Sequence, residues 1–178
     1  MIEQGSIAPD DAVVVPILDT VVVSITDTLF IPHETGVVNF ILIRHAEKSS
    51  DCSDPVLTEE GKARAEKLAI MFSKIELDRV YSTNYNRTRQ TVQPTADSHE
   101  LPITSYGGYD QSEVIEDVLE NLNEGTLLIV GHSNSTPGFL NILTGSTDYP
   151  AIQEEEFDNL FLVSSRSIGD SDVVHLKY

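Results

Sequence analysis

Two histidines in the sequence follow runs of apolar residues with no turn in between. His45 comes after Arg44 at the end of "VVNFILI", and His132 comes after Gly131 at the end of "TLLIV". A short continuous apolar run is typical of a parallel strand that is buried on both faces of a sheet. Because the carboxyl ends of parallel strands meet at one edge of the sheet, where α/β proteins bind ligands, we expect both histidines at one site.

Two histidines could bind a metal ion or an anion, and the surrounding residues favour the anion. A catalytic zinc ion normally takes three protein ligands, and the sequence has no His-Glu-x-x-His spacing. Cys52 is the single cysteine, which excludes a multi-cysteine metal site and an internal disulfide. Arg44 beside His45 would repel a divalent cation but can hold phosphate oxygens through its planar fork of N–H groups. We therefore predict a phosphate site that needs no metal and no other cofactor.

A second arginine for this site is expected from the segment "VYSTNYNRTRQTV". Arg87 lies just past the predicted strand "RVYS", at the start of a predicted helix whose N-terminal dipole also favours anions. Arg89 is two residues further along, and one of the two arginines is expected to be a solvated surface charge. Because Arg87 is nearer the strand end, it is the better candidate for the pocket.

The elements that must position these residues alternate between strands and helices. Thr58 can cap a helix in "LTEEGKARAEKLAIMF". Further helices are predicted at 84–97, ending near Pro94 or shortly after it, at 111–123 and at 136–144. Short strands are predicted in "DRVYST" and "LPITSY", and "NLFLVSS" and "DVVHLKY" are predicted to form an antiparallel edge. This order predicts an α/β fold, a three-layer sandwich with a mainly parallel central sheet.

The first 36 residues differ from the rest in charge and composition. They contain six acidic residues and no Lys or Arg, and "AVVVPILDTVVVSI" is rich in β-branched residues. Pro16 and Asp19 interrupt this run, which indicates short strands or an extended arm rather than a helix. We predict two parts: a β-rich extension or arm at 1–36, and the main domain at 37–178.

The net charge excludes several classes of partner. The chain has 29 acidic residues against 11 Lys and Arg, a formal charge of −18. Such a surface repels nucleic acid and anionic membranes. There is no run of 18 apolar residues that would predict a membrane span. The N-terminus also lacks the basic start and compact apolar core of a signal peptide, so a soluble protein is expected.

Four segments, "LIRHAEK", "LTEEGKARAEKLA", "VYSTNYNRTRQTV" and "VGHSNS", resemble motifs of the histidine phosphatase superfamily in their usual order. The resemblance is to a compact member of the first branch and covers roughly 37–178. It implies the phosphoglycerate-mutase-like fold, with His45 as a nucleophile that becomes phosphohistidine. It also implies that Arg44 and Arg87 clamp the phosphoryl oxygens and that His132 donates to the phosphoryl group, with no metal required.

The sequence departs from that family at two points. Ala46 stands where the family usually has glycine, a mild change if the backbone torsion is not left-handed. The family members that act on phosphate esters also use a Glu or Asp to protonate the leaving oxygen. Here the candidate general acids are Asp110 and Glu113, and each is also explained as a solvated carboxylate at a helix start. Without an acid, a phosphohistidine, an acyl phosphate or an activated phosphoester is favoured over mutase substrates.

Residues beside the two histidines complete the predicted site. Glu47 and Lys48 follow the first histidine motif, and Ser133 and Asn134 follow the second, so all four are candidate pocket residues. The predicted function is hydrolysis of a phosphomonoester or phosphohistidine, with a phosphorylated small molecule or phosphoprotein as partner. The alternative is a phosphate-binding or interaction module of the same fold with weak or no turnover.

Overall fold

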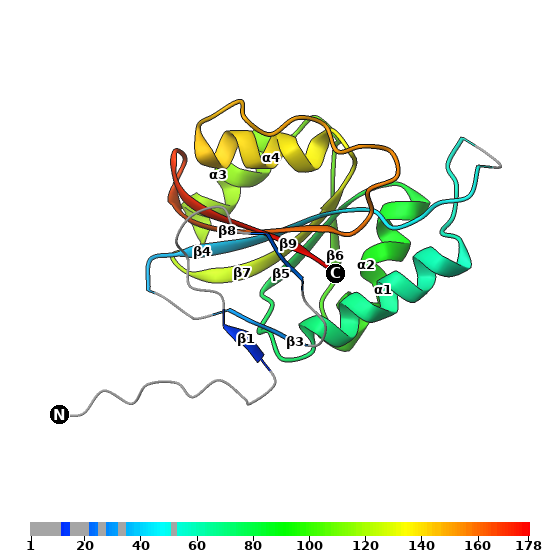
Figure 1. The fold of residues 1–178 in the computed structure, drawn as a ribbon. Helices are drawn as coiled ribbons and strands as arrows, with labels where there is room; N and C mark the ends of the chain where they lie inside the picture. Colours follow the sequence, from blue (N-terminus) through cyan, green and yellow to red (C-terminus); the bar gives the residue numbers. More distant parts are fainter. Residues whose placement is uncertain (1–11, 15–21, 25–27, 32–34, 51–52) are drawn as a thin grey trace.

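The computed structural model describes residues 12–14, 22–24, 28–31, 35–50 and 53–178. They form four helices and nine strands in the order shown in Figure 1. The helices are α1 (Glu59–Phe72), α2 (Asn86–Ser98), α3 (Gln111–Asn121) and α4 (Ser135–Thr144). The strands are β1 (Ala12–Val14), β2 (Val22–Ser24), β3 (Thr28–Phe30), β4 (Val38–Arg44), β5 (Arg79–Thr83), β6 (Ile103–Tyr106), β7 (Gly125–Gly131), β8 (Asn159–Ser167) and β9 (Asp170–Lys177).

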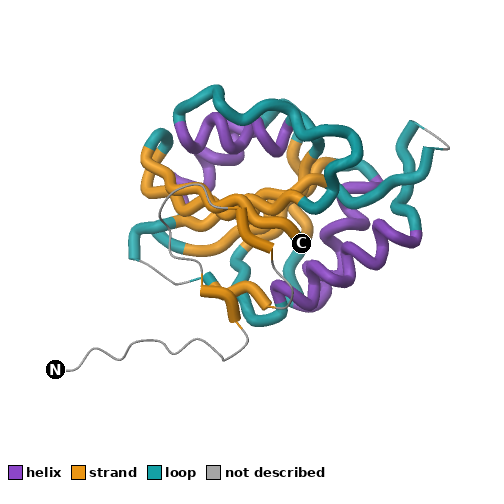
Figure 2. The backbone as a smooth tube through the Cα atoms, in the orientation of Figure 1, coloured by secondary structure: helices purple, strands orange, loops and turns teal. Residues whose placement is uncertain are grey.

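A central sheet of seven strands has the order β2-β9-β8-β4-β7-β5-β6. β8 runs antiparallel to its neighbours β4 and β9, and every other pairing in this sheet is parallel. Figure 2 shows helices on both sides of the sheet. The α/β fold with a mainly parallel sheet is therefore confirmed.

Alternate residues of β4 pack into two separate cores. Ile41 and Ile43 join residues of α1 and α2, whereas Phe40 and Leu42 join residues of α3 and α4. Successive side chains of a strand point to opposite faces, so a strand covered by helices on both faces must be apolar at every position. This explains the four apolar residues at 40–43 before Arg44, and it makes β4 the central strand of a three-layer sandwich.

The predicted helices occur, and α2 ends at Ser98, shortly after Pro94 as predicted. The Thr58 hydroxyl accepts a hydrogen bond from the Gly61 N–H at 3.1 Å, as expected for the cap of α1. α2 continues four residues beyond Pro94 to Ser98. Thr95 and Ala96 are fully buried in this last part, so tertiary packing stabilises a turn that the proline alone would weaken.

The C-terminal strands pair as predicted but do not form the edge of the sheet. β8 and β9 are antiparallel to each other, yet β8 also pairs with β4, and β2 lies outside β9. β1 and β3 form a separate two-stranded parallel sheet. Most of the predicted 1–36 extension, including Pro16 and Asp19, lies outside the described residues, as does Cys52. The division at residue 36 therefore stays a prediction. Among the residues that the structure describes, no helix is both long and apolar enough to cross a membrane.

Candidate active site

The register of β4 and β7 places the two histidines side by side. Arg44 pairs with Gly131, and the His45 N–H donates to the Gly131 carbonyl at 3.0 Å immediately beyond the strands. The imidazole rings of His45 and His132 meet edge to face, with centroids 5.6 Å apart. The expected meeting of the two strand-end histidines therefore occurs in the structure.

The His45 ring is buried, neutral and held in one orientation. Its Nδ1 lies 2.8 Å from the Ala46 carbonyl oxygen, which can only accept, so Nδ1 carries the proton. Burial lowers the pKa of His45 to about 3; the Ala46 carbonyl opposes this shift, and the positive charges of Arg44 and Arg87 add to it. A neutral ring protonated at Nδ1 has its lone pair on Nε2, which is the form that a nucleophile needs.

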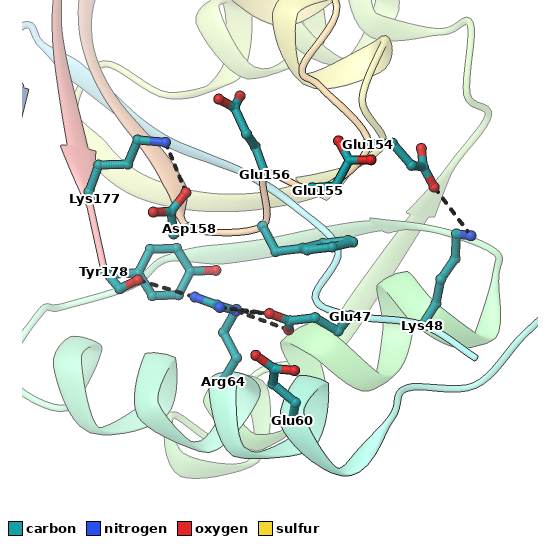
Figure 3. A pocket seen from close by; sticks show the side chains of 11 residues that line it. Glu47, Lys48, Glu60, Arg64, Glu154, Glu155, Glu156, Asp158, Lys177 and Tyr178 are labelled. Carbon is teal, nitrogen blue, oxygen red and sulfur yellow. Dashed lines mark hydrogen bonds and ion pairs between the residues drawn. The ribbon is translucent and has the colours of Figure 1, made fainter. Parts of the chain in front are cut away.

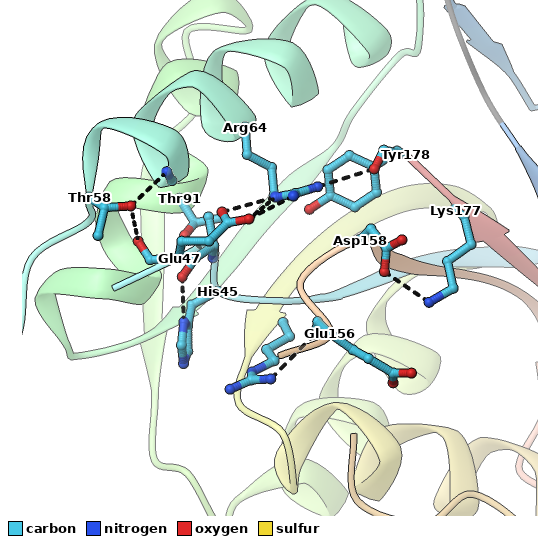
Figure 4. Close-up of polar contacts among 12 residues, drawn as sticks. His45, Glu47, Thr58, Arg64, Thr91, Glu156, Asp158, Lys177 and Tyr178 are labelled. Carbon is cyan, nitrogen blue, oxygen red and sulfur yellow. Dashed lines mark hydrogen bonds and ion pairs between the residues drawn. The ribbon is translucent and has the colours of Figure 1, made fainter. Parts of the chain in front are cut away.

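Both backbone polar groups of Ala46 make hydrogen bonds. Its carbonyl accepts from the His45 ring, and its N–H donates to the Thr91 hydroxyl of α2 at 2.9 Å. Figure 4 shows these contacts beside the α1 cap at Thr58. Among the described residues, Glu100 is the single non-glycine with a positive φ. Ala46 therefore avoids the left-handed conformation, and its methyl group is accommodated without backbone strain.

Arg44 is buried against the loop that precedes β8. Its Nη1 donates to the carbonyls of Gln153 at 2.7 Å, Glu154 at 2.9 Å and Glu156 at 3.3 Å. Its Nη2 contacts the Glu154 carboxylate at 3.2 Å, and the guanidinium stacks on Phe157 with its central carbon 4.5 Å from the ring centroid. Burial lowers the pKa of Arg44, and the neighbouring Glu154 partly offsets this. Arg44 is thus a rigid cation at one end of the site.

Arg87 supplies a second cation from the first turn of α2. Its Nη2 lies 3.4 Å from Nδ1 of His132, and its guanidinium stacks over Tyr85 at 4.5 Å. Asp54 contacts Arg87 at a longer 3.8 Å and accepts from the Asn86 N–H, also at the start of α2. Arg89, in contrast, donates to the Ser105 hydroxyl on the exposed surface. Of the two arginines, Arg87 is the one that reaches the histidines.

His132 has protein partners at both ring nitrogens. Nε2 lies 2.9 Å from the Thr83 hydroxyl and Nδ1 faces Arg87, a donor. Nδ1 therefore accepts and Nε2 carries the proton. Burial lowers the pKa of His132 to about 4, and the nearby Arg87 and Arg44 lower it further. Ser135 accepts from the backbone N–H of His132 at 2.8 Å, which fixes the turn between β7 and α4.

These side chains surround a pocket of about 520 Å³. Lys48, Ser133 and Asn134 line it as predicted from the sequence, together with Gly108 and Tyr109. The complete lining is Arg44, His45, Lys48, Tyr85, Arg87, Gly108, Tyr109, His132, Ser133, Asn134 and Glu154. Three of the charged lining residues are cations and one is a carboxylate.

Neither candidate general acid lines this pocket. Asp110 and Glu113 are both exposed at the start of α3. Asp110 occupies the N-cap position, but its side chain makes no capping hydrogen bond. The structure therefore does not bring either carboxylate to His45.

Glu47 belongs to a neighbouring pocket of about 730 Å³. Both of its carboxylate oxygens accept from Arg64 of α1, at distances between 2.6 and 3.0 Å. Arg64 also donates to the Tyr178 backbone carbonyl at 3.1 Å. Figure 3 shows this ion pair and the carboxylates around it. Glu47 thus ties the loop after His45 to α1 and does not line the histidine pocket.

Glu154 is the charged pocket residue that sequence reasoning missed; it also missed Tyr85, Gly108 and Tyr109. It lines both pockets, and its carboxylate contacts Arg44 at 3.2 Å and Lys48 at 3.5 Å. The available signal was the acidic run "EEE" at 154–156, between α4 and β8. No group of three or more His, Cys, Asp or Glu side chains arranged to hold a metal ion occurs within the described residues.

Comparisons with known proteins agree with this architecture. Residues 40–108 match the family model of the histidine phosphatase superfamily (branch 1). No curated protein matches the chain in sequence. The solved structure of the protein histidine phosphatase SixA with tungstate has a TM-score of 0.64 and 18% identity, over 76% of this chain and 93% of that chain.

Two other solved structures share the fold. Mycobacterial glucosyl-3-phosphoglycerate phosphatase has a TM-score of 0.64 and 11% identity, over 77% of this chain and 97% of that chain. Phosphoserine phosphatase from Entamoeba histolytica, in complex with 3-phosphoglyceric acid, has a TM-score of 0.55 and 17% identity, over 71% and 90%. The resemblance read from the sequence is confirmed: residues 40–108 match the histidine phosphatase superfamily, branch 1, and the chain has the histidine phosphatase fold.

Proposed function

We propose that the protein is a phosphatase that hydrolyses a phosphomonoester or a phosphohistidine through a covalent phosphohistidine on His45. The observation that carries this proposal is the hydrogen bond from His45 Nδ1 to the Ala46 carbonyl. Together with the pKa of about 3, it leaves a neutral ring with its lone pair on Nε2. This ring lies in a pocket that also holds Arg44 and Arg87.

The two arginines are suited to stabilise the transition state of phosphoryl transfer. Charge on the equatorial phosphoryl oxygens is stabilised by donors that are already in place, which removes the cost of reorganisation. Arg44 and Arg87 both line the pocket as fixed cations. His132 orients Arg87 in this geometry, and donation from His132 to the phosphoryl group stays a prediction that requires its ring to release Thr83 or Arg87.

The proposed reaction has two steps. In the first, Nε2 of His45 attacks phosphorus, the bond from phosphorus to the leaving atom breaks, and the leaving atom takes that electron pair. In the second, a water oxygen attacks the phosphohistidine, the phosphorus–nitrogen bond breaks, and the electron pair returns to Nε2. The water protons leave with phosphate and solvent, so His45 ends in the neutral form in which it began.

The carboxylates around the pocket favour leaving groups that need little help from an acid. Asp110 and Glu113 do not line the pocket, and Glu154 is engaged by Arg44 and Lys48. A phosphohistidine nitrogen, an acyl phosphate or a nitrophenolate can leave without a dedicated proton donor, whereas an alkoxide leaves poorly. The SixA neighbour is named a protein histidine phosphatase, and phosphohistidine is one of these leaving-group types.

The test compares wild type with His45→Ala on p-nitrophenyl phosphate and on a phosphohistidine peptide. Turnover of at least one substrate is expected, with a loss of more than about a thousandfold in the variant, as for the removal of a covalent nucleophile. Rapid quenching into alkali should trap phosphate on wild-type protein, and peptide mapping should place it on His45. Full activity of the His45→Ala variant, or label on another residue, would contradict the proposal.

A phosphate-binding module without turnover is the second candidate. The specific observation in its favour is that the 153–157 loop already binds Arg44, and that Glu154 is the one carboxylate in the part of the lining that the structure describes. Folded wild-type protein that binds vanadate or phosphate but hydrolyses neither test substrate would support this candidate.

A further inference from the structure

The terminal nitrogens of Arg44 are already occupied by the chain itself. Nη1 donates to three backbone carbonyls of the loop before β8, and Nη2 contacts Oε2 of Glu154 at 3.2 Å. The three carbonyls hold the guanidinium in place without help from the carboxylate. The carboxylate of Glu154 therefore stands where another anion could use the same cation.

Lys48 also contacts the Glu154 carboxylate. Its ammonium lies 3.5 Å from Oε1 of Glu154, so the two oxygens of one carboxylate contact two different cations. Arg44 is 2% exposed, whereas the side chain of Glu154 is 66% exposed. An exposed carboxylate on a buried arginine can swing away into solvent, while the arginine stays fixed.

The charges that line the pocket define what kind of anion it accepts. Arg44, Lys48 and Arg87 are cations, and Glu154 is the only carboxylate among the described residues of the lining, with Asp54 behind Arg87 at 3.8 Å. Both histidines are neutral near pH 7. A phosphoryl dianion therefore balances the pocket, and a second negative charge on the substrate would meet Glu154 rather than a free cation.

We propose that Glu154 is a specificity-determining residue that competes with the phosphoryl group for Arg44 and Lys48. The site then favours phosphoryl compounds whose remainder is neutral or cationic over those with a second anionic group near the phosphorus. This inference deepens the proposed function and rests on phosphoryl binding beside His45. It makes a phosphorylated nitrogen base or amine a better ligand than a phosphorylated carboxylic acid.

The experiment measures equilibrium binding and so does not depend on turnover. Titration calorimetry would follow inorganic phosphate, phosphoethanolamine and 3-phosphoglycerate with wild type, Glu154→Gln and Glu155→Gln. Glu155 is the matched control, since it is the next residue of the same acidic run, loses the same charge, and does not line the histidine pocket.

Glu154→Gln should bind phosphate about five- to tenfold more tightly than wild type, the size expected for removing one charge about 4 Å away that is screened as in bulk water, as suits an exposed carboxylate. The gain should be larger for 3-phosphoglycerate than for phosphoethanolamine, so selectivity for the cationic ligand should fall. Glu155→Gln should change each affinity by less than about twofold, as for an exposed charge that is largely screened.

Two results would overturn the inference. Equal effects of the two variants on all three ligands would show that only the net charge of the loop matters. Weaker phosphate binding by Glu154→Gln would make Glu154 a support for Arg44 and Lys48 instead of their competitor. Failure of the hydrolysis test leaves these titrations intact, because binding is measured directly, so the two ideas can fail separately.

Discussion

Replacing Thr91 with valine should weaken the link between the nucleophile loop and α2. The Thr91 hydroxyl is fully buried, donates to the Arg87 carbonyl at 2.7 Å and accepts from the Ala46 N–H at 2.9 Å. Valine has the same shape but neither capability, so the buried Ala46 N–H would lose its partner. An unsatisfied buried donor costs about 1–3 kcal/mol, and a lost neutral hydrogen bond costs about 1 kcal/mol. Burial of the added methyl group offsets part of this.

The expected net loss for Thr91→Val is about 2 kcal/mol in the free energy of unfolding. For a chain of this length, that corresponds to a fall in Tm of roughly 4–8 °C. The matched control lies one helical turn further along α2. Thr95 is equally buried, but its hydroxyl has no hydrogen-bond partner. Thr95→Val should therefore be neutral or stabilise the protein by about 1 kcal/mol, since it removes an unsatisfied polar group.

Urea denaturation of wild type, Thr91→Val and Thr95→Val at pH 7.5 would measure both effects. The same shift in both variants would refute the reasoning, because the two sites differ in hydrogen bonding and not in burial. A functional readout adds to this comparison. Thr91→Val should also lower kcat, since Ala46 is the residue whose carbonyl holds the His45 ring.

Three further perturbations test other parts of the structure. The folded-state pKa of His45, about 3, is below its ordinary value of 6.5, so its contribution to stability is complete above pH 6.5 and is lost as the pH falls toward 3. In urea denaturation, the free energy of unfolding of wild type should thus fall by about 1.4 kcal/mol per pH unit relative to that of His45→Gln between pH 6 and pH 4.5. If the difference between the two free energies did not change with pH, the ring would not be buried in its neutral form. Gly61→Ala should destabilise the protein by about 2 kcal/mol in the same assay, because the new methyl group would overlap the Glu47 carbonyl; unchanged stability would show that α1 can move away from this loop. Arg87→Gln should weaken phosphate binding in calorimetry by about tenfold or more, the value of a charged hydrogen bond. The control Arg89→Gln removes a half-buried arginine that does not line the pocket and should differ little from wild type; equal losses in the two variants would argue against a local contact.

The parts of the fold that were predictable are those with a strong local pattern. β4 and β7 are apolar at consecutive positions because helices cover both faces of the sheet, and this pattern also placed His45 and His132 at one edge. The cap at Thr58 was readable for a similar reason, since a hydroxyl that accepts from the third N–H needs only nearby residues.

Side-chain direction and long-range contacts were not predictable in this way. Glu47 follows the histidine motif closely enough to suggest a pocket residue, but Arg64 binds it on the side away from the histidines. Glu154 reaches Arg44 across a separation of 110 residues, from a loop with no periodic pattern. Asp110 and Glu113 were plausible by position alone, and only the three-dimensional path of α3 shows that they face solvent.

The order of strands has a consequence for how this chain reaches its native state during synthesis. β4 carries the proposed nucleophile near the start of the described domain, yet its partners are β7 and β8, which begin at Gly125 and Asn159. Until β7 leaves the ribosome both edges of β4 are unpaired, and until β8 follows one edge stays unpaired, which makes β4 the kind of apolar segment that associates with other chains. Pairings this distant in sequence also slow folding. Nascent chains that stop before β8 should therefore be the aggregation-prone species and clients of chaperones, and the sheet edge that precedes His45 can be completed only after β8 has been synthesised.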